Sequence, residues 1–231
     1  MNLKLFETKK LHYGKYLYKI TLYNDLSTIF RMEFQKENFS FARGKLDELH
    51  LSYQESKKID PMVGHIPWQK YNRDYVRVDH FFDAINLYRL LKKADDYKLR
   101  VEQNTANIYT NNREFVKTLI NNLKTVIEFW EPDPENIATL TNHKNVILVD
   151  KPPKYKYKLT FGKEKGSSAL AKWIDKNPNL AKAGEILKQD LYKEGYVKGL
   201  YFYVKDDKAM MLAQLLVGEN IQRVDELLYN P

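Results

Sequence analysis

The stretch Lys15-Tyr16-Leu17-Tyr18-Lys19-Ile20-Thr21-Leu22 is repeated later in the chain as Lys154-Tyr155-Lys156-Tyr157-Lys158-Leu159-Thr160-Phe161. Both read K-Y-x-Y-K, followed by an aliphatic residue, a threonine and an apolar residue. A second echo follows in each half, where residues 108–114 match residues 202–208 and a helical pattern comes next. Because the matches occur in the same order, the sequence predicts an internal duplication of one α+β unit.

Each unit is predicted to have the order β-α-β-β-α-β, which is the ferredoxin-like arrangement. In the first unit, period-two alternation predicts strands and three-to-four-residue apolar spacing predicts helices. The predicted strands are 15–24, 98–102, 106–111 and 125–130, and the predicted helices are 41–53, 79–91 and 113–122. Two helices between the first two strands make the crossover of this unit an enlarged one.

The second unit follows the same plan with shorter connections. Its predicted strands are 154–161, 196–198 and 200–205, and its predicted helices are 167–176, 181–193 and 208–217. Gly218 is the expected stop of the last helix. The pattern over 221–227 fits either a strand or a helix, and the sequence leaves this choice open.

The predicted domains are therefore 1–133 and 151–231, joined by a linker over 134–150. The linker has a possible extra strand at 146–149, which is a short apolar run. The first domain carries a basic and aromatic insertion at 56–78. An insertion of this length is too long for a simple connector, so we expect it to fold over the sheet as a clamp.

The composition favours a globular, basic protein. The chain has 231 residues, a net charge of +8, 17 tyrosines and no cysteine. The absence of cysteine excludes a disulfide scaffold, a thiolate metal site and a cysteine nucleophile. Since the sequence has neither a long apolar run nor an apolar signal core, we expect a cytoplasmic protein. The wealth of Lys, Asn, Tyr and Ile suggests an AT-rich genome, such as that of a phage or of a low-GC bacterium. If the protein is viral, the host cytoplasm or the virion is expected.

Strand alternation predicts where the charged side chains lie. In the strand 154–161, Tyr155, Tyr157, Leu159 and Phe161 share one face, and Lys154, Lys156 and Lys158 share the other. Helices cover only one face of a ferredoxin-like sheet, so the apolar side chains are expected there. The lysines are then expected on the open face of the sheet.

An open sheet face that carries lysines and tyrosines suits single-stranded DNA or RNA, because phosphates bind the amines and bases stack on the rings. The insertion supplies further basic and aromatic candidates. The predicted nucleic-acid-binding residues are Lys15, Lys19, Tyr109, Lys154, Lys156, Lys158, Tyr201, Tyr203, Trp68, Lys70, Tyr71, Arg73 and Arg77.

Two other functions remain open at this stage. The sheet faces can instead form the interfaces of a homo-oligomer, as in a viral or phage structural or assembly protein. The tyrosines would then be ordinary interface aromatics. The alternative to a clamp for the insertion is that it buries Trp68 and Tyr71 against its own domain.

The third candidate is a metal-dependent nuclease or nucleotidyl-transfer enzyme that uses Asp206 or His80. Aspartates that follow a strand bind metal in polymerase palms, but Asp206 also fits the N-cap of the next helix. The five histidines lack metal-ligand spacing, and no phosphate-binding glycine loop is present. The sequence therefore favours a binding protein without catalytic residues, metal or cofactor, and with no membrane partner.

Overall fold

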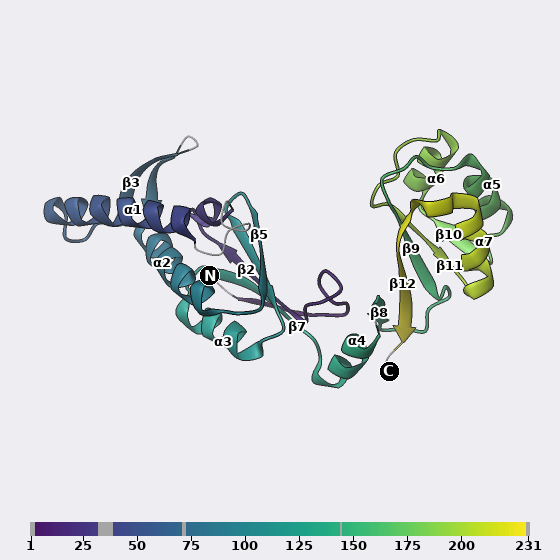
Figure 1. The fold of residues 1–231 in the computed structure, drawn as a ribbon, viewed down its shortest axis with the longest axis horizontal. Coiled ribbons are helices and arrows are strands. Elements are labelled where there is room, and N and C mark those ends of the chain that lie inside the picture. Colours follow the sequence, from purple (N-terminus) through teal and green to yellow (C-terminus); the bar gives the residue numbers. More distant parts are fainter. Residues whose placement is uncertain (1–2, 32–38, 71–72, 144, 230–231) are drawn as a thin grey trace. The chain divides into compact units, whose positions relative to one another are not determined.

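The structure, a computed structural model, describes residues 3–31, 39–70, 73–143 and 145–229. The protein is a mixed α+β structure with two five-stranded sheets, each in its own compact unit (Figure 1). Unit 1 comprises Met1–Thr8 and Lys15–Ile137, and unit 2 comprises Lys9–Gly14 and Ala138–Pro231. The chain therefore passes between the units after Thr8, after Gly14 and again after Ile137.

The sheet of unit 1 has the strand order β1-β7-β2-β6-β5. The edge strand β1 pairs in parallel with β7, and all other neighbours are antiparallel. The strands are β1 (Lys4–Glu7), β2 (Tyr18–Tyr23), β5 (Tyr97–Glu102), β6 (Thr105–Thr110) and β7 (Val126–Glu131). Four of these lie close to the predicted positions, whereas β1 was not predicted.

The α-helices in the described part of unit 1 are α1 (Ser40–Ile59), α2 (Val78–Lys93) and α3 (Arg113–Asn122). The helix α3 has the predicted bounds, because the Asn112 side chain accepts a hydrogen bond from the Phe115 amide at 3.0 Å and caps its first turn. Fully buried apolar side chains fill the space between helices and sheet, among them Ile20 and Phe81.

The insertion at 56–78 forms a hairpin rather than a clamp. After α1 ends at Ile59, β3 (His65–Lys70) and β4 (Arg73–Arg77) pair with each other as a two-stranded sheet. Ile66 and Val76 are fully buried, and the hairpin packs beside α1 and α2 (Figure 1). The expectation that this segment covers the sheet is therefore wrong, because its apolar side chains pack against helices.

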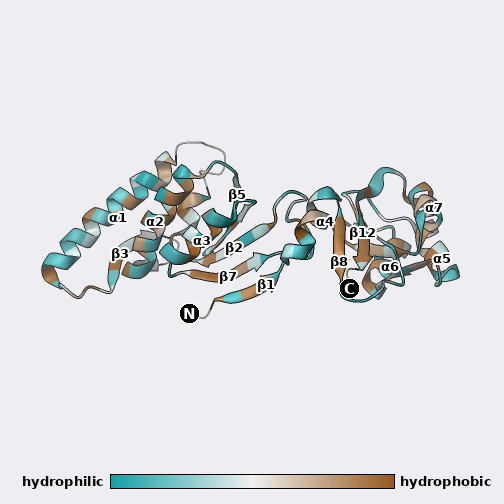
Figure 2. Ribbon diagram, turned by 90° about the horizontal axis from the view of Figure 1, so that it is seen from below, coloured by the Kyte–Doolittle hydropathy of each residue, from teal (hydrophilic) through white to brown (hydrophobic). Residues whose placement is uncertain are grey.

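The sheet of unit 2 has the order β10-β11-β9-β12-β8. Its strands are β8 (Val146–Val149), β9 (Tyr157–Phe161), β10 (Ala181–Ala183), β11 (Tyr201–Val204) and β12 (Ile221–Tyr229). The segment that the sequence left open is thus the strand β12. The predicted extra strand is β8, which is apolar throughout (brown in Figure 2) and pairs in parallel with β12.

The helices α5 (Ser168–Lys176), α6 (Glu185–Tyr192) and α7 (Asp207–Val217) pack on one face of this sheet (Figure 1), and α4 (Ile137–Asn142) lies where the chain enters unit 2. Alternate side chains of β9 and β11, including Leu159, Phe161 and Phe202, form one core with these helices. Because the helices lie on one side, the other side chains of the same strands lie on the opposite face of the sheet.

Two predictions for unit 2 are wrong. Residues 196–198 form no strand, since Tyr196 makes only an isolated bridge to Lys165. The second strand is instead β10, at the place where a helix was predicted over 181–193, and α6 begins only at Glu185. Unit 2 therefore has a helix between its second and third strands, where the β-α-β-β-α-β order has a hairpin.

Among the described residues, no helix combines the length and the apolar character that crossing a membrane requires.

Candidate functional site

The face of the unit 2 sheet opposite the helices carries a cross-strand row of lysine and tyrosine. In β9, Tyr157 and Leu159 are buried in the core, so Lys158 between them points to the other face. The strand register places Lys158 beside Tyr203 of β11 and Tyr203 beside Lys182 of β10. We call this face, with Lys158, Tyr201, Tyr203 and Lys182, the open face of unit 2.

Unit 1 has the same row at the corresponding strand positions. Lys19 of β2 lies beside Tyr109 of β6, and Tyr109 lies beside Lys98 of β5. On the other side of Lys19 is Trp130 of β7, whose ring lies 5.3 Å from the Lys19 ammonium. A Lys-Tyr-Lys row therefore crosses both sheets at the same place in the strand order.

A second tyrosine joins each row from the segment just before the strand. Tyr155 lies 6.5 Å from Tyr203, centroid to centroid, with the rings 33° apart, and Lys154 lies over the Tyr155 ring at 5.4 Å. Alternation had placed Tyr155 on the packed face with Tyr157. That prediction is wrong, because β9 begins only at Tyr157 and the chain before it bends.

The corresponding residues of unit 1 repeat this arrangement. Tyr16 lies 6.5 Å from Tyr109 with the rings 36° apart, and Lys15 lies over the Tyr16 ring at 4.8 Å. The two units thus share the spacing and the relative orientation of this tyrosine pair.

The two rows differ in their accessibility. Tyr109 is only 7% exposed and Tyr16 is buried as well, so neither ring offers a free face to a base. In unit 2, Tyr201 is 44% exposed and Lys182 is exposed, whereas Tyr203 is half-buried. Burial, together with the neighbouring Tyr201, raises the pKa of the Tyr203 hydroxyl, which therefore stays protonated at neutral pH.

The Lys158 ammonium lies at the centre of the open face. It sits over the Tyr201 ring, 3.7 Å from its centroid, and Tyr201 meets Tyr203 edge-on at 5.6 Å. Asp225 is the neighbour of Lys158 in β12, but its carboxylate bonds to Lys10 at 2.7 Å and to Arg223 at 2.9 Å. Within the described residues, Lys158 therefore has no carboxylate partner of its own.

Lys156 does not lie on the open face, contrary to the prediction. Its ammonium is 3.5 Å from Glu226 and 3.8 Å from Asp207, the first residue of α7. The hydrogen bond to Tyr157, followed by the charges of Glu226 and Asp207, raises the pKa of Lys156 to about 12. The positive charge of Lys156 is therefore already paired with two carboxylates of the protein.

The predicted lysines of unit 1 also have acidic partners. The Lys15 ammonium lies 2.8 Å from Asp96, and this bond raises the pKa of Lys15. The Lys19 ammonium lies 3.8 Å from Glu128. The candidate lysines of unit 1 are therefore less available to an external anion than those of unit 2.

The described candidates of the insertion belong to the hairpin of β3 and β4. Trp68 is half-buried within its hairpin, and Arg77 forms an ion pair with Asp79 at 2.6 Å. Tyr71 and the side chains of Lys70 and Arg73 lie outside the described part of the structure.

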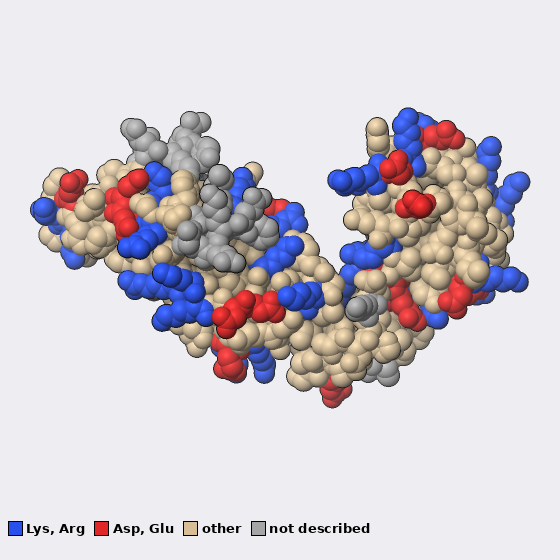
Figure 3. All heavy atoms as spheres, viewed as in Figure 1, with Lys and Arg blue, Asp and Glu red and all other residues tan. Residues whose placement is uncertain are grey.

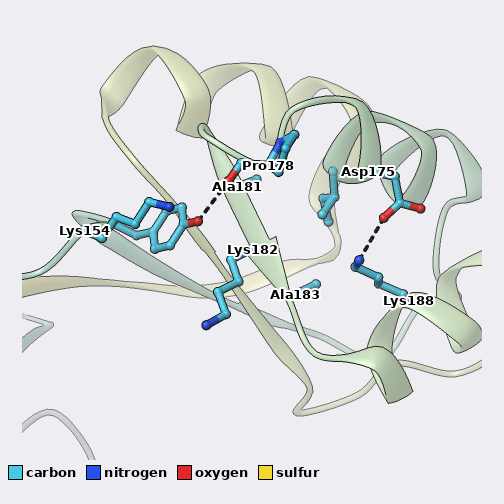
Figure 4. A pocket seen from close by; sticks show the side chains of 9 residues that line it. Lys154, Asp175, Pro178, Ala181, Lys182, Ala183 and Lys188 are labelled. Atoms are coloured by element: carbon cyan, nitrogen blue, oxygen red, sulfur yellow. Dashed lines mark hydrogen bonds and ion pairs between the residues drawn. The ribbon is translucent and has the colours of Figure 1, made fainter.

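A pocket of about 370 Å³ adjoins the open face at the edge strand β10 (Figure 4). It begins at Lys154 and Tyr155, passes Lys182, and ends at the ion pair between Asp175 and Lys188, which are 2.9 Å apart. Sequence reasoning missed Lys182 and this pocket because residues 181–193 read as one helix. Basic side chains also lie along the side of unit 2 where β9 and β12 are drawn (Figures 1 and 3).

The two residues considered for catalysis, Asp206 and His80, make structural contacts. Asp206 accepts a hydrogen bond from the Ala209 amide at 2.9 Å and caps α7. His80 bonds Asp25 at 2.9 Å in a buried position. No group of three His, Asp or Glu side chains in the described residues is arranged to hold a metal ion.

Comparisons of the chain with protein-family models, with curated proteins and with solved structures found no match.

Proposed function

We propose that the protein binds single-stranded nucleic acid on the open face of unit 2. The observation that carries the proposal is the lysine and tyrosine row on this face, where Lys158 and Lys182 flank Tyr203 and Tyr201 is exposed. The net charge of +8 favours a polyanionic ligand.

The chemistry of the face favours unpaired bases. Lysine ammonium groups bind phosphates at any sequence, and exposed aromatic rings stack on bases. Stacking contributes roughly 1–3 kcal/mol per base and requires a base that is not already paired. Tyr201 offers an exposed aromatic ring next to the charge of Lys158.

We further propose that the two units are ferredoxin-like and arose by duplication. Three shared features support a common origin. The strand order is the same, a fifth strand pairs in parallel at one edge (β1 with β7, β8 with β12), and each unit has a tyrosine pair at 6.5 Å. In this interpretation the first copy keeps the row as part of its packing, and the second copy keeps it exposed for a ligand.

The test is a binding titration with a labelled single-stranded oligonucleotide. Lys158→Glu should reduce the affinity at least about tenfold, because it replaces an attractive charge by a repulsive one at the centre of the face. Tyr201→Ala should reduce it about five- to tenfold through lost stacking. Lys172→Glu on α5 has the same charge change away from the face and serves as the control.

Salt titration gives an independent measurement. The slope of log K against log salt for single strands is about −0.7 per phosphate neutralised, so Lys158→Gln should make it less steep by about that amount. Equal affinity of the wild type and Lys158→Glu would reject this surface.

The assembly protein and the nuclease stay predictions from the sequence. Light scattering of nucleic-acid-free protein distinguishes the first, since a large salt-resistant oligomer would favour it. We do not propose the nuclease, because the Asp206 carboxylate serves as the cap of α7.

A further inference from the structure

The pocket beside β10 has chemically different ends. At one end are Lys154 and Lys182, and among the described residues neither of them has an acidic partner. At the other end Asp175 and Lys188 form an ion pair (Figure 4). An anionic group is therefore favoured at the first end, and a neutral group with hydrogen-bonding edges at the second.

Between these ends the walls are apolar and aromatic. The Tyr155 ring forms one wall, and its hydroxyl donates a hydrogen bond to the Pro178 carbonyl at 3.0 Å, which fixes the ring. Ile174 and Ala183 also line the space. A volume of about 370 Å³ lies within the usual range for small-molecule sites and accommodates one nucleotide.

The Asp175 carboxylate is held as an ionised acceptor. The Tyr192 hydroxyl donates to it at 2.6 Å, and Lys188 bonds its other oxygen. These bonds, that of Tyr192 first, lower the pKa of Asp175. An ionised carboxylate only accepts hydrogen bonds, so it favours a base edge that carries an amino group.

We propose that this pocket receives one nucleotide of the bound strand, with its phosphate between Lys154 and Lys182 and an amino-bearing base edge at Asp175. Cytosine presents an amino donor at the position where thymine and uracil present a carbonyl acceptor. The pocket therefore distinguishes cytosine from thymine or uracil. This inference rests on the proposed function, since the strand must first lie on the open face of unit 2.

The experiment compares oligo(dC) with oligo(dT) of equal length at neutral pH, by fluorescence anisotropy. The wild type should bind oligo(dC) about five- to tenfold more tightly, which corresponds to one well-placed base contact. Asp175→Asn should bring this ratio close to one, mainly by weakening oligo(dC) binding. Lys182→Gln should weaken both oligonucleotides by the same factor, because it acts on the phosphate.

Asp190→Asn removes a carboxylate of α6 that does not line the pocket, so it should keep the wild-type ratio. Asp175→Glu is the second variant, for use if Asp175→Asn fails to fold. It keeps the charge but moves the carboxylate, so it should also lower the ratio of oligo(dC) to oligo(dT) affinity. If the wild type binds both oligonucleotides equally, or if Asp175→Asn and Asp175→Glu keep the preference, the pocket inference is wrong while the proposed function stands. If neither oligonucleotide binds, both are wrong.

Discussion

Three polar groups meet at the start of α7, where the Tyr157 hydroxyl donates to the Asp207 carboxylate and Lys156 lies close by. The Tyr157 bond, ahead of the Lys156 charge, lowers the pKa of Asp207. A lowered folded-state pKa means that the contribution of Asp207 to stability is present above its ordinary pKa. The contribution is lost as the pH falls through the folded-state value.

Tyr157→Phe should therefore raise the pKa of Asp207 toward its ordinary value, because the hydrogen bond to the charged form is lost. The decrease in the free energy of unfolding that Asp207 causes as the pH falls should then be smaller. Carbon-detected NMR titration of the aspartate carboxylates measures the pKa of Asp207 and, in the same experiment, that of Asp175.

Tyr192→Phe is the matched control, since it removes the bond to Asp175 and leaves Asp207 untouched. Each substitution should move the pKa of its own partner only. If Tyr157→Phe leaves the pKa of Asp207 unchanged, the bond to Tyr157 is not what lowers it.

Single residues also mark where alternation stops predicting direction. Tyr16 and Tyr155 precede their strands, where the chain bends and a neighbouring amide bonds elsewhere: the Leu17 amide to the Asn111 side chain, the Lys156 amide to the Lys205 carbonyl. At these positions each ring meets the tyrosine of its row, Tyr16 meeting Tyr109 and Tyr155 meeting Tyr203. Period-two reasoning holds only within a paired strand, so the sequence pattern alone could not place these rings.

At the level of elements, the end of α7 depends on Gly218. This residue has φ +63° and ψ −139°, a combination that is essentially restricted to glycine. A Cβ added there would meet no atom within 4 Å, so any cost of substitution comes from the backbone. The predicted helix stop therefore has a conformational cause.

Gly218→Ala should lower the free energy of unfolding of unit 2 by about 1–3 kcal/mol. Gly44→Ala, within α1 and equally free of close neighbours, should instead stabilise unit 1 by about 0.5–1 kcal/mol. Urea unfolding followed by circular dichroism measures both changes. A neutral Gly218→Ala would show that this turn relaxes without strain.

The strand β10 shows why propensity misled the prediction at the element scale. Ala181-Lys182-Ala183 has the composition of a helix, and only its pairing with β11 makes it a strand. By contrast, α3 matched its predicted bounds because Asn112 supplies a local cap. Elements with local signals were predictable, and those made by distant pairing were not. Lys182, half of the candidate phosphate site, was missed for this reason.

At the scale of the whole molecule, the segment Lys9–Gly14 belongs to unit 2 although the residues on either side of it belong to unit 1. Lys10 bonds Asp225, whose side chain is 0% exposed, and the Leu148 amide donates to the Lys9 carbonyl at 2.8 Å. Burial lowers the pKa of Lys10 despite this partner. Desolvation, together with the neighbouring charges of Arg223 and Lys158, therefore offsets the effect of Asp225 on this pKa.

Lys10→Met should destabilise unit 2 by about 1–3 kcal/mol, because it leaves the buried Asp225 with Arg223 as its remaining cation. Asp225→Asn in the same chain should recover part of this loss by removing the charge. A double-mutant cycle in denaturant measures the coupling of the two residues. Additive effects would mean that Lys10 and Asp225 do not stabilise each other.

The overall plan of two α+β units was predictable because the repeated strands are local sequence features. The contribution of Lys9–Gly14 to unit 2 was not, since no pattern near Lys10 indicates a partner 215 residues away. The same limit applies to the candidate site. Lys158 and Tyr203 were predicted from alternation, but the difference in exposure between the two rows depends on tertiary packing.

The separation of Lys10 from Asp225 has a consequence for synthesis on the ribosome. Lys10 emerges 215 residues before its partner, which at roughly 5–20 residues per second is a delay of about 10–40 s. The last strand of the unit 1 sheet, β7, is made within that interval, whereas the early segment of unit 2 must wait for β12 before it can dock. Unit 2 is therefore completed late relative to the synthesis of Lys10, and a nascent chain stalled before β12 should leave Lys9–Gly14 accessible to protease.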